Sequence, residues 1–322
     1  MAYELKNKLV IGVASSAVFD LSESDRVFRT EGEEAYRAFQ ERNINEPLAP
    51  GMAFPFIRRL LSLNRLAADP DHPLVEVILL SKNDPDTGMR VMKTIEHYKL
   101  NITRAIFTQG ISPHAYIPAL NISLFLSAND DDVRHAIKAG HPAGCVLSSH
   151  FDDDELDETL RVAFDFDGVL AGDESESVMQ ASGLSAFHDH EVRNIARPHS
   201  PGPLKHFLVK LSEIQSIEEG YKKAHPDYKN RVRVSIVTAR NAPSHERALQ
   251  SLKSWGVIVN EAFFLGGIEK KAVLDVMKPH LFFDDQPVHL KAASEVVPAV
   301  HVPFGALNVE RPSFEAKNDA DT

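Results

Sequence analysis

The stretch "LRVAFDFDGVLAGDESE", residues Leu160–Glu176, places two carboxylates where an apolar run ends. Short runs that are apolar throughout are typical of buried strands in parallel sheets. Alternation along an extended chain points Asp165 and Asp167 to the same side and turns Phe166 into the core. Gly168 permits the tight bend that follows. We therefore expect a buried strand that presents paired acids at its carboxyl end.

Composition places the chain among globular proteins and argues against nucleic acid as a partner. The 322 residues are 43% hydrophobic and 25% charged, which suits one large domain or two ordinary ones. The net charge is −11, and no run is rich in Lys or Arg. Nucleic-acid binding without sequence preference needs concentrated positive charge. An acidic protein that handles phosphates would need a metal ion or a few lysines to concentrate positive charge locally.

Cysteine content and apolar runs limit the compartment. Cys145 is the only cysteine, so neither an intrachain disulfide nor a Cys-based zinc site can form. The start, "MAYELKNKLVIGVASS", lacks the layout of a secretory signal, and no run approaches the ~20 apolar residues that span a bilayer. We expect a cytoplasmic protein without a membrane partner, and a flexible tail at 311–322.

An internal repeat runs along the chain. The segment "VEVILLSKNDPDTGMRVMKTIEHYKLNITRAIFTQGIS" from Val75 aligns without a gap on the segment from Val232, at an offset of 157 positions. Earlier segments align at an offset of 151, because the second copy has a longer polar loop around "EEGYKKAHPDYKN". Apolar periodicity is common to all α/β segments, but it would not also match an Arg-Asn-Ile triplet and a Pro-Gly turn. We therefore expect two related halves, 1–150 and 151–310, joined by the acidic linker at 148–158.

Each half has the same expected order of strands and helices. Alternating strands and helices, with strands apolar throughout, predict a parallel sheet covered on both faces. In the helix at 243–255, Ser244 stands at the N-cap position, and Ala248, Leu249, Leu252 and Trp255 form one apolar stripe. The expected strands lie at 8–14, 75–81, 103–108, 122–127, 161–166, 232–238, 261–265 and 280–284, and the other helices at 86–99, 112–120 and 269–277.

Polar residues follow several strands of the second half, where open parallel sheets bind ligands. A single Asp at a strand end is as readily a turn or a helix cap, and Asp284 with Asp285 could form a solvated edge. Converging carboxylates, however, repel each other unless a cation binds, and hard oxygen ligands suit Mg²⁺. The predicted site consists of Asp165, Asp167, Thr238, Lys270, Asp284 and Asp285.

These motifs resemble those of a known superfamily. Asp-x-Asp-Gly-Val-Leu, then a Thr, a Lys and an Asp-Asp pair, resemble the haloacid dehalogenase-like phosphohydrolases. "RVAFDFDGVLAGDESE", "PGPLKHFL", "IVTARNAPSHERAL", "SWG", "EAFFLGG" and "PHLFFDDQ" are similar to the cytosolic type I 5'-nucleotidases, as are "GMAFPFIRRL", "EHYKLNITRAIFTQG" and "LFLSAND" in the first half. The likeness runs from about residue 8 to residue 305. Phe166 and Gly168 depart from the family's Gly and Ala around the second Asp, and neither side chain is catalytic.

The resemblance implies a fold and a mechanism. The fold would be a haloacid dehalogenase-like Rossmannoid parallel sheet with a helical cap insert at about 171–231. The reaction would be Mg²⁺-dependent hydrolysis of nucleoside 5'-monophosphates, AMP being favoured. Asp165 would be the nucleophile and Asp167 the acid and base, while Thr238 and Lys270, preferred over Lys271, would hold the phosphoryl oxygens. Asp165, the Asp167 carbonyl, and Asp284 or Asp285 would hold the metal.

Substrate contacts outside these motifs would come from the cap and from the loop after the strand at 232–238. His188, Asp189 and His190 could suggest a metal site, but a spacing of two does not bring side chains together on a helix. Exposed or polar core histidines are the favoured interpretation. The substrate-binding set is Thr238, Ala239, Arg240, Lys270, Phe187, His199 and Lys205.

The first half lacks the residues that would carry the chemistry. In the alignment Asp165 becomes Ala14, Asp167 becomes Ser16 and Lys270 becomes Pro113. Asp284 and Asp285 become Ser127 and Ala128, and Thr238 becomes Ser81. We expect residues 1–150 to form a phosphatase-like lobe without catalysis, either purely structural or binding an adenine-nucleotide effector. Assembly as a homo-oligomer stays open. Alternatives for the whole chain are a phosphatase for another small phosphate ester and a non-catalytic nucleotide sensor.

Overall fold

A computed structural model describes residues 3–149 and 151–308, so the tail expected at 311–322 lies outside the described residues. Ten strands form one sheet in the order β3-β2-β1-β4-β5-β10-β9-β6-β7-β8. All neighbouring pairs are parallel except β5 and β10, which run antiparallel. This α/β arrangement with a mostly parallel central sheet fits the Rossmann-like fold expected from the sequence.

The first five strands occupy one end of the sheet, with β1 central among them. Their registers place Leu9 opposite Val75 and Ile11 opposite Leu124. The strands are β1 (Leu9–Val13), β2 (Val75–Ser81), β3 (Arg104–Phe107), β4 (Leu124–Ser127) and β5 (Ala143–Val146).

The last five strands occupy the other end, with β6 central among them. Leu160 lies opposite Val232 and Val162 opposite Leu281. The two ends join where Val300 pairs with Val146. The strands are β6 (Leu160–Phe164), β7 (Val232–Thr238), β8 (Glu261–Phe264), β9 (Leu281–Asp284) and β10 (Ala299–His301).

Eleven α-helices lie among the described residues, and none of them is long and apolar enough to cross a membrane. Two helix–strand units, α6 with β5 and α11 with β10, had not been expected from the sequence. The stretch expected as a helix at 112–120 is a 3₁₀ turn followed by a single helical turn. The helices are α1 (Ser15–Val18), α2 (Ser22–Arg42), α3 (Phe54–Ser62), α4 (Pro85–His97), α5 (Tyr116–Ala119), α6 (Asp130–Lys138), α7 (Glu174–Arg193), α8 (Lys205–Ala224), α9 (His245–Ser254), α10 (Lys270–Met277) and α11 (Pro287–Ala293).

The two ends of the sheet share one hydrophobic core on one face. There α3 packs against β6 and α8 packs against β1, so each helix reaches a strand of the other end. The rings of Phe56 and Phe207 meet edge to face, with centroids 6.4 Å apart. On the opposite face the buried apolar residues form two separate clusters, one for each end. The shared core makes the ten strands one packed unit.

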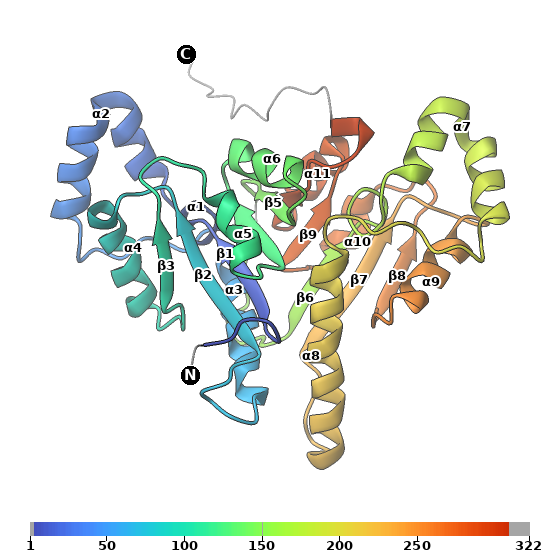
Figure 1. The fold of residues 1–322 in the computed structure, drawn as a ribbon, viewed down its shortest axis with the longest axis horizontal. Coiled ribbons are helices and arrows are strands. Elements are labelled where there is room, and N and C mark those ends of the chain that lie inside the picture. Colours follow the sequence, from blue (N-terminus) through green and yellow to red (C-terminus); the bar gives the residue numbers. More distant parts are fainter. Residues whose placement is uncertain (1–2, 150, 309–322) are drawn as a thin grey trace.

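Helices α2 and α7 stand beyond opposite ends of the sheet (Figure 1). Each is kinked at a glycine. Gly32 has φ 86° and ψ −179°, and Gly183 has φ 79° and ψ 179°. This backbone region is open essentially to glycine alone. The two glycines therefore fix the bend of each helix.

Helix α9 confirms one local expectation and corrects another. Ser244 is the N-cap residue as expected, although its hydroxyl donates to the Asn241 carbonyl at 2.7 Å and does not cap a helix amide. Leu249 is 44% exposed, whereas Ala248 and Leu252 are buried. The apolar stripe is therefore narrower than the sequence indicated.

Candidate active site

The predicted site residues come from the carboxyl ends of adjacent strands. Asp165 directly follows β6, Asp284 ends β9, and Thr238 ends β7. Because β6 lies between β7 and β9 and runs parallel to both, these ends meet at one edge of the sheet. Lys270 is the first residue of α10. The sheet order thus brings four separate segments together.

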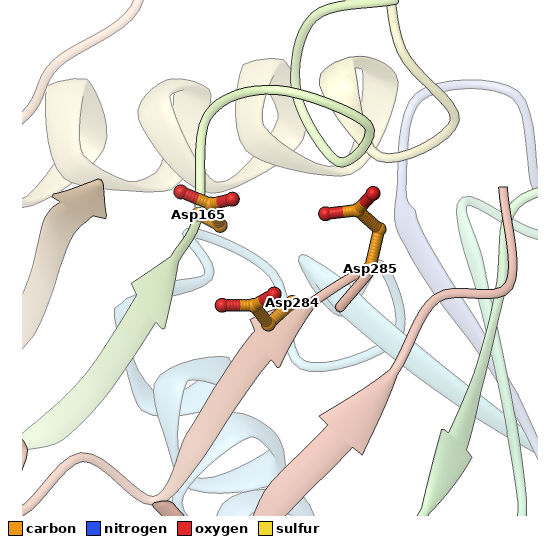
Figure 2. Close-up of side chains that lie close together, drawn as sticks. All are labelled: Asp165, Asp284 and Asp285. Atoms are coloured by element: carbon orange, nitrogen blue, oxygen red, sulfur yellow. The ribbon is translucent and has the colours of Figure 1, made fainter. Parts of the chain in front are cut away.

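Three carboxylates meet at this edge (Figure 2). Asp165, Asp284 and Asp285 each offer one oxygen, and these atoms all lie within 4.8 Å of one another. All three residues are buried. The Asp167 side chain does not belong to this group. The cluster is therefore made by the ends of β6 and β9 alone.

Lys270 supplies positive charge to this cluster. Its ammonium lies 3.0 Å from Asp165 Oδ1 and donates to Asp284 Oδ2 at 2.7 Å. Burial alone would lower the pKa of Lys270, but the two carboxylates outweigh it and raise the pKa. Lys271, the other lysine weighed from the sequence, pairs with Glu295 at the surface. Lys270 is thus the lysine that reaches the acids.

The pKa values of the two acids beside Lys270 shift in opposite directions. Burial and the negative charge of Asp284 raise the pKa of Asp165 to about 6, although Lys270 opposes the shift. Burial would also raise the pKa of Asp284, but Lys270 and His289 together hold it below its usual value. His289 Nδ1 lies 3.3 Å from Asp284 Oδ2. Of the two acids, Asp284 is therefore the one whose ionised form its surroundings favour.

Asp285 has a different environment from its neighbour. Its Oδ1 is buried without a hydrogen-bond partner. Burial and the charges of Asp284 and Asp165 raise the pKa of Asp285 to about 10. Asp284, in contrast, accepts from Lys270 and from the Gln286 amide at 2.8 Å. An unpartnered oxygen among three hard-oxygen donors fits a divalent cation such as Mg²⁺.

Gly168 lets the loop after β6 pass close to Asp285. Its φ is +71°, a conformation that side-chain-bearing residues rarely adopt. A Cβ at this position would lie 2.5 Å from Asp285 Oδ2. The glycine is therefore required both by the turn and by the approach of the acid.

Asp167 is held by Arg240. The Arg240 Nε donates to Asp167 Oδ2 and its Nη2 to Oδ1, each at 2.7 Å. This is a bidentate ion pair, the strongest geometry available to an arginine and a carboxylate. Phe166 is fully buried as expected, and the Arg240 guanidinium lies over its ring at 5.1 Å. Asp167 thus stays beside the cluster with a counter-charge of its own.

The predicted cap contacts take up several different places. Phe187 is buried, and the Arg240 guanidinium lies over its ring at 5.2 Å. His199 is buried with Nδ1 2.8 Å from Ser251 Oγ and Nε2 3.1 Å from Glu191 Oε2. Lys205 lies over the Trp255 ring at 5.4 Å. Contact of these three residues with a substrate stays a prediction, as does contact with exposed Ala239.

The neighbouring histidines serve as hydrogen-bonding residues. His188 Nε2 lies 3.1 Å from Asn241 Oδ1, and His190 Nε2 lies 3.2 Å from Glu174 Oε1. Among the described residues, the acids and histidines close enough together to hold a metal are the three aspartates at the strand ends, and neither histidine belongs to such a group. His188 and His190, two positions apart on the helix, therefore have different partners.

Sequence reasoning missed Glu191 and His289. Glu191 stands in the polar stretch "HDHEVRN", and nothing there distinguishes it from its exposed neighbours. Its carboxylate is nevertheless fully buried among arginines. His289 follows the Asp-Asp pair by a few residues on α11, which could have suggested a supporting role. The role of Glu191 as a buried counter-charge can be recognised only in the folded structure, where the arginines around it are in place.

The fold and this cluster define the class of protein. A family model described as 5'-nucleotidase matches residues 1–309. The chain therefore belongs to the 5'-nucleotidase family, and the resemblance to the cytosolic type I enzymes is confirmed.

A particular relative supports the same assignment. Over 295 residues the chain is 34% identical to human cytosolic 5'-nucleotidase 1B. The match covers 90% of this chain and 48% of the human protein, so the chain spans about half the length of that relative. No solved structure matches the chain significantly.

Proposed function

We propose that this protein is a Mg²⁺-dependent 5'-nucleotidase that hydrolyses nucleoside 5'-monophosphates to nucleoside and phosphate. The observation that carries the proposal is the buried cluster of Asp165, Asp284 and Asp285 with Lys270 between two of its members. A buried group of acids with one lysine, and with an Asp285 oxygen that has no hydrogen-bond partner, suits a phosphate together with a cation. Family membership supports the same reaction.

Asp165 is the proposed nucleophile. One of its oxygens attacks phosphorus and forms a phospho-aspartyl intermediate, and the nucleoside leaves with the bridging oxygen. Asp167 carries a proton on one oxygen while Arg240 donates to the other. It gives this proton to the bridging oxygen and then, as a carboxylate, accepts one from the water that hydrolyses the intermediate. Thr238 and Lys270 hold the transferring phosphoryl oxygens. The buried setting excludes bulk water, which strengthens each of these interactions.

The metal would be held by Asp165, the Asp167 carbonyl and Asp285. A bound Mg²⁺ would neutralise charge on the phosphate and on the nucleophile. Asp285 is proposed as the direct ligand because its Oδ1 has no other partner. Asp284 instead orients Lys270. This assignment separates two acids that the sequence could not distinguish.

Magnesium titration of two variants tests that division of roles. Asp285→Asn should weaken Mg²⁺ binding measured by calorimetry by tenfold or more, because a direct ligand is lost. Asp284→Asn should change Mg²⁺ affinity less and should disturb Lys270 instead. Equal losses in the two variants would contradict the assignment.

AMP is the proposed substrate among the nucleotides, and a cytosolic location is proposed from the name of the human relative. Phosphate release from AMP, IMP, dAMP and glucose 6-phosphate, with Mg²⁺ or with EDTA, tests the reaction and the preference. Release that requires Mg²⁺ and favours AMP would support the proposal. Preference for the sugar phosphate would favour a phosphatase for another small ester.

We also propose that residues 1–150 and 151–310 are related copies. The bounds of β1 and β6, and of β2, β3 and β4 against β7, β8 and β9, differ by the same offsets as the aligned sequences. The kinks at Gly32 and Gly183 correspond as well. The first copy carries Ala14 and Ser16 where the second has Asp165 and Asp167, so it has neither nucleophile nor acid.

We propose that the effector binds in a cavity of the first copy. It has a volume of about 630 Å³ and lies between α2 and the ends of β2 and β3. Phe28 and Tyr36 offer aromatic rings for a base, while Lys82 pairs with Asp132. An adenine nucleotide is the effector that we propose for it.

Titration of the Asp165→Asn variant with AMP and Mg²⁺ tests the effector site, since that variant binds without turnover. Two sites per chain are expected, and Phe28→Ala should remove one. A stoichiometry of one would leave the first copy a purely structural role. A homo-oligomer stays a separate prediction for sedimentation analysis.

A further inference from the structure

A buried ion network joins the cap helix α7 to the edge of the sheet. Its centre is Glu191, whose side chain is 0% exposed. The Glu191 carboxylate accepts from Ser175 Oγ at 2.8 Å, from Arg247 Nη1 at 2.8 Å and from Arg240 Nη1. Burial alone would raise the pKa of Glu191, but the hydrogen bond from His199 and the charge and hydrogen bond of Arg240 hold it well below its usual value. One carboxylate is thus shared by two arginines.

Arg240 carries this network to Asp167. Its Nε and Nη2 hold Asp167, and its Nη1 donates to Glu191 and to the Ser244 carbonyl at 3.0 Å. The other N–H group of Nη2 faces His199 Nε2, and the two nitrogen atoms are 3.1 Å apart. A guanidinium has five donors: four meet oxygen acceptors within the protein, and the fifth faces the His199 ring. Arg240 is therefore directed at protein groups in this conformation.

The first half contains only part of this network. Arg90 donates to Gln40 Oε1 at 3.3 Å and to the Glu46 carbonyl at 2.9 Å. At the corresponding places, Arg247 donates to Glu191 and to the Arg197 carbonyl at 2.9 Å. This shared part anchors the kinked helix in both halves.

The other part occurs only beside the acids. Where the second half has Arg240 and Asp167, the first has Asn83 and Ser16. The uncharged Gln40 stands in place of Glu191. The second carboxylate–arginine link is therefore present where Asp167 is present and missing where Asp167 is missing. This second link is not needed to anchor the helix, because Gln40 and Arg90 anchor the corresponding helix of the first half without it.

We propose that Arg240 is a positioning residue for Asp167, and that Glu191 holds Arg240 in place from the cap helix. The proposal rests on the proposed function, in which Asp167 gives a proton to the leaving oxygen. A bidentate pair fixes both the position and the plane of the carboxylate. It also keeps Asp167 apart from the three clustered acids, which would otherwise compete with it for the same cation.

Lysine cannot replace Arg240 in this arrangement. An ammonium is a point charge, whereas the guanidinium fork holds Asp167 on one side and Glu191 on the other. Removing Glu191 leaves Arg240 paired to Asp167 but free to shift toward it. We therefore expect a graded series of effects, with Arg240→Gln the strongest, Arg240→Lys next and Glu191→Gln the weakest.

The test compares AMP with its analogue that has sulfur in place of the bridging 5'-oxygen. Both make the same nucleoside contacts, but a thiolate leaves without needing a proton. The value of kcat/KM covers only the steps up to release of the nucleoside, so it isolates leaving-group protonation. General acids contribute about 10²–10⁴-fold. Asp167→Asn should therefore lose at least about 10²-fold on AMP and about tenfold less on the sulfur analogue.

Arg240→Gln should follow the pattern of Asp167→Asn, with a larger loss on AMP than on the analogue. Arg240→Lys and Glu191→Gln should show smaller losses of kcat/KM with the same substrate dependence. These two variants still test the proposal if Arg240→Gln fails to fold. Arg90→Gln, the matched control in the first half, should lower thermal stability and leave the ratio of the two kcat/KM values unchanged.

Three results would overturn the proposal. Equal losses on both substrates in the Arg240 and Glu191 variants would make the network a purely structural anchor. Unchanged kinetics on both substrates would remove any link to Asp167. A network effect without a matching effect of Asp167→Asn would show that the proposed role of Asp167 is wrong while AMP hydrolysis itself stands. An unmutated protein that hydrolyses neither substrate would remove the proposed function and the inference together.

Discussion

Asp165 and Ala14 hold corresponding places, each directly after the central strand of its end of the sheet. Around Asp165 lie two further acids and a lysine, all buried, and around Ala14 lie small and hydroxyl side chains. The hydroxyls make polar contacts there, such as Ser15 Oγ with Ser81 Oγ at 3.3 Å and the Ala128 amide with Ser16 Oγ at 3.4 Å. The same backbone geometry thus supports a charged site at one end and a neutral one at the other.

The difference has an energetic side. Burying carboxylates costs several kcal/mol each unless they are paired or bind a cation. In the second half this cost is offset by the positive charges of Lys270, Arg240 and, in our proposal, Mg²⁺. The first half avoids the cost because Ala14, Ser16 and Ala128 carry no charge. The comparison teaches that the sheet fixes where chemistry can occur, while a few charged side chains decide whether it does.

The largest expected effect is the loss of activity when Asp165 is replaced, compared with replacement of Ala14. Asp165→Asn should reduce phosphate release from AMP by at least about 10³-fold, because the amide cannot act as the nucleophile. The matched variant Ala14→Asn should change activity less than about twofold, since we propose that the first half takes no part in the chemistry. Phosphate release under saturating Mg²⁺ measures both. Strong loss in Ala14→Asn would contradict the division between the halves.

The next effect concerns stability and its pH dependence. Glu191→Gln copies the first half's Gln40 and leaves two arginines without their carboxylate, so it should lower the free energy of unfolding by about 3–5 kcal/mol at pH 7. The folded-state pKa of Glu191 lies below its ordinary 4.5. The unfolded chain therefore takes up the proton first as pH falls below that value, and the native protein loses this stabilisation.

Urea unfolding between pH 7 and pH 3.5 measures this effect. The difference in the free energy of unfolding between the unmutated protein and Glu191→Gln should be constant above about pH 5. It should shrink below pH 4.5. Gln40→Ala, the control in the first half, should show a difference that does not depend on pH. A difference for Glu191→Gln that grows in acid would contradict the sign.

The kinked helices offer a smaller, paired effect. Gly32→Ala and Gly183→Ala each force an alanine into a glycine-only backbone region, and each should destabilise the protein by about 1–3 kcal/mol. An added Cβ would meet nothing within 4 Å at either site, so the cost is one of backbone conformation. Only Gly183→Ala should also raise KM for AMP, because α7 belongs to the proposed cap. Thermal unfolding and steady-state kinetics separate the two effects.

The smallest effect sharpens the comparison at the turn. The second half has Gly168 where the first has Ala17. Gly168→Ala would bring a Cβ to 2.5 Å from Asp285 Oδ2, displacing the proposed metal ligand. The Mg²⁺ concentration for half-maximal activity should therefore rise about tenfold, equivalent to about 1.4 kcal/mol of binding. Ala17→Gly should leave that concentration unchanged.

Several parts of the fold followed from local sequence. The apolar runs gave the positions of eight strands within a residue or two, because a buried parallel strand must be apolar on both faces. The junction of the two ends was not predictable. The antiparallel pairing of Val146 with Val300 depends on how short strands from distant segments meet, and local sequence carries no sign of it.

The site shows the same division. The strand-end positions of Asp165, Thr238 and Asp284 follow from the order of motifs along the chain, and the choice of Lys270 followed from the resemblance to the family. The sequence could not separate Asp284 from Asp285, since both follow one strand. Only the packed structure places one beside Lys270 and leaves an oxygen of the other without a partner.

By itself the sequence determined which residues could do chemistry, because residue type and strand ends are local properties. The tertiary structure decided their charge states and partners. The burial of Glu191 and the bonds of Arg240 to Asp167 and Glu191 depend on three segments meeting in a water-excluded space. Electrostatic energies depend on distance and burial, and neither is defined until the chain has folded.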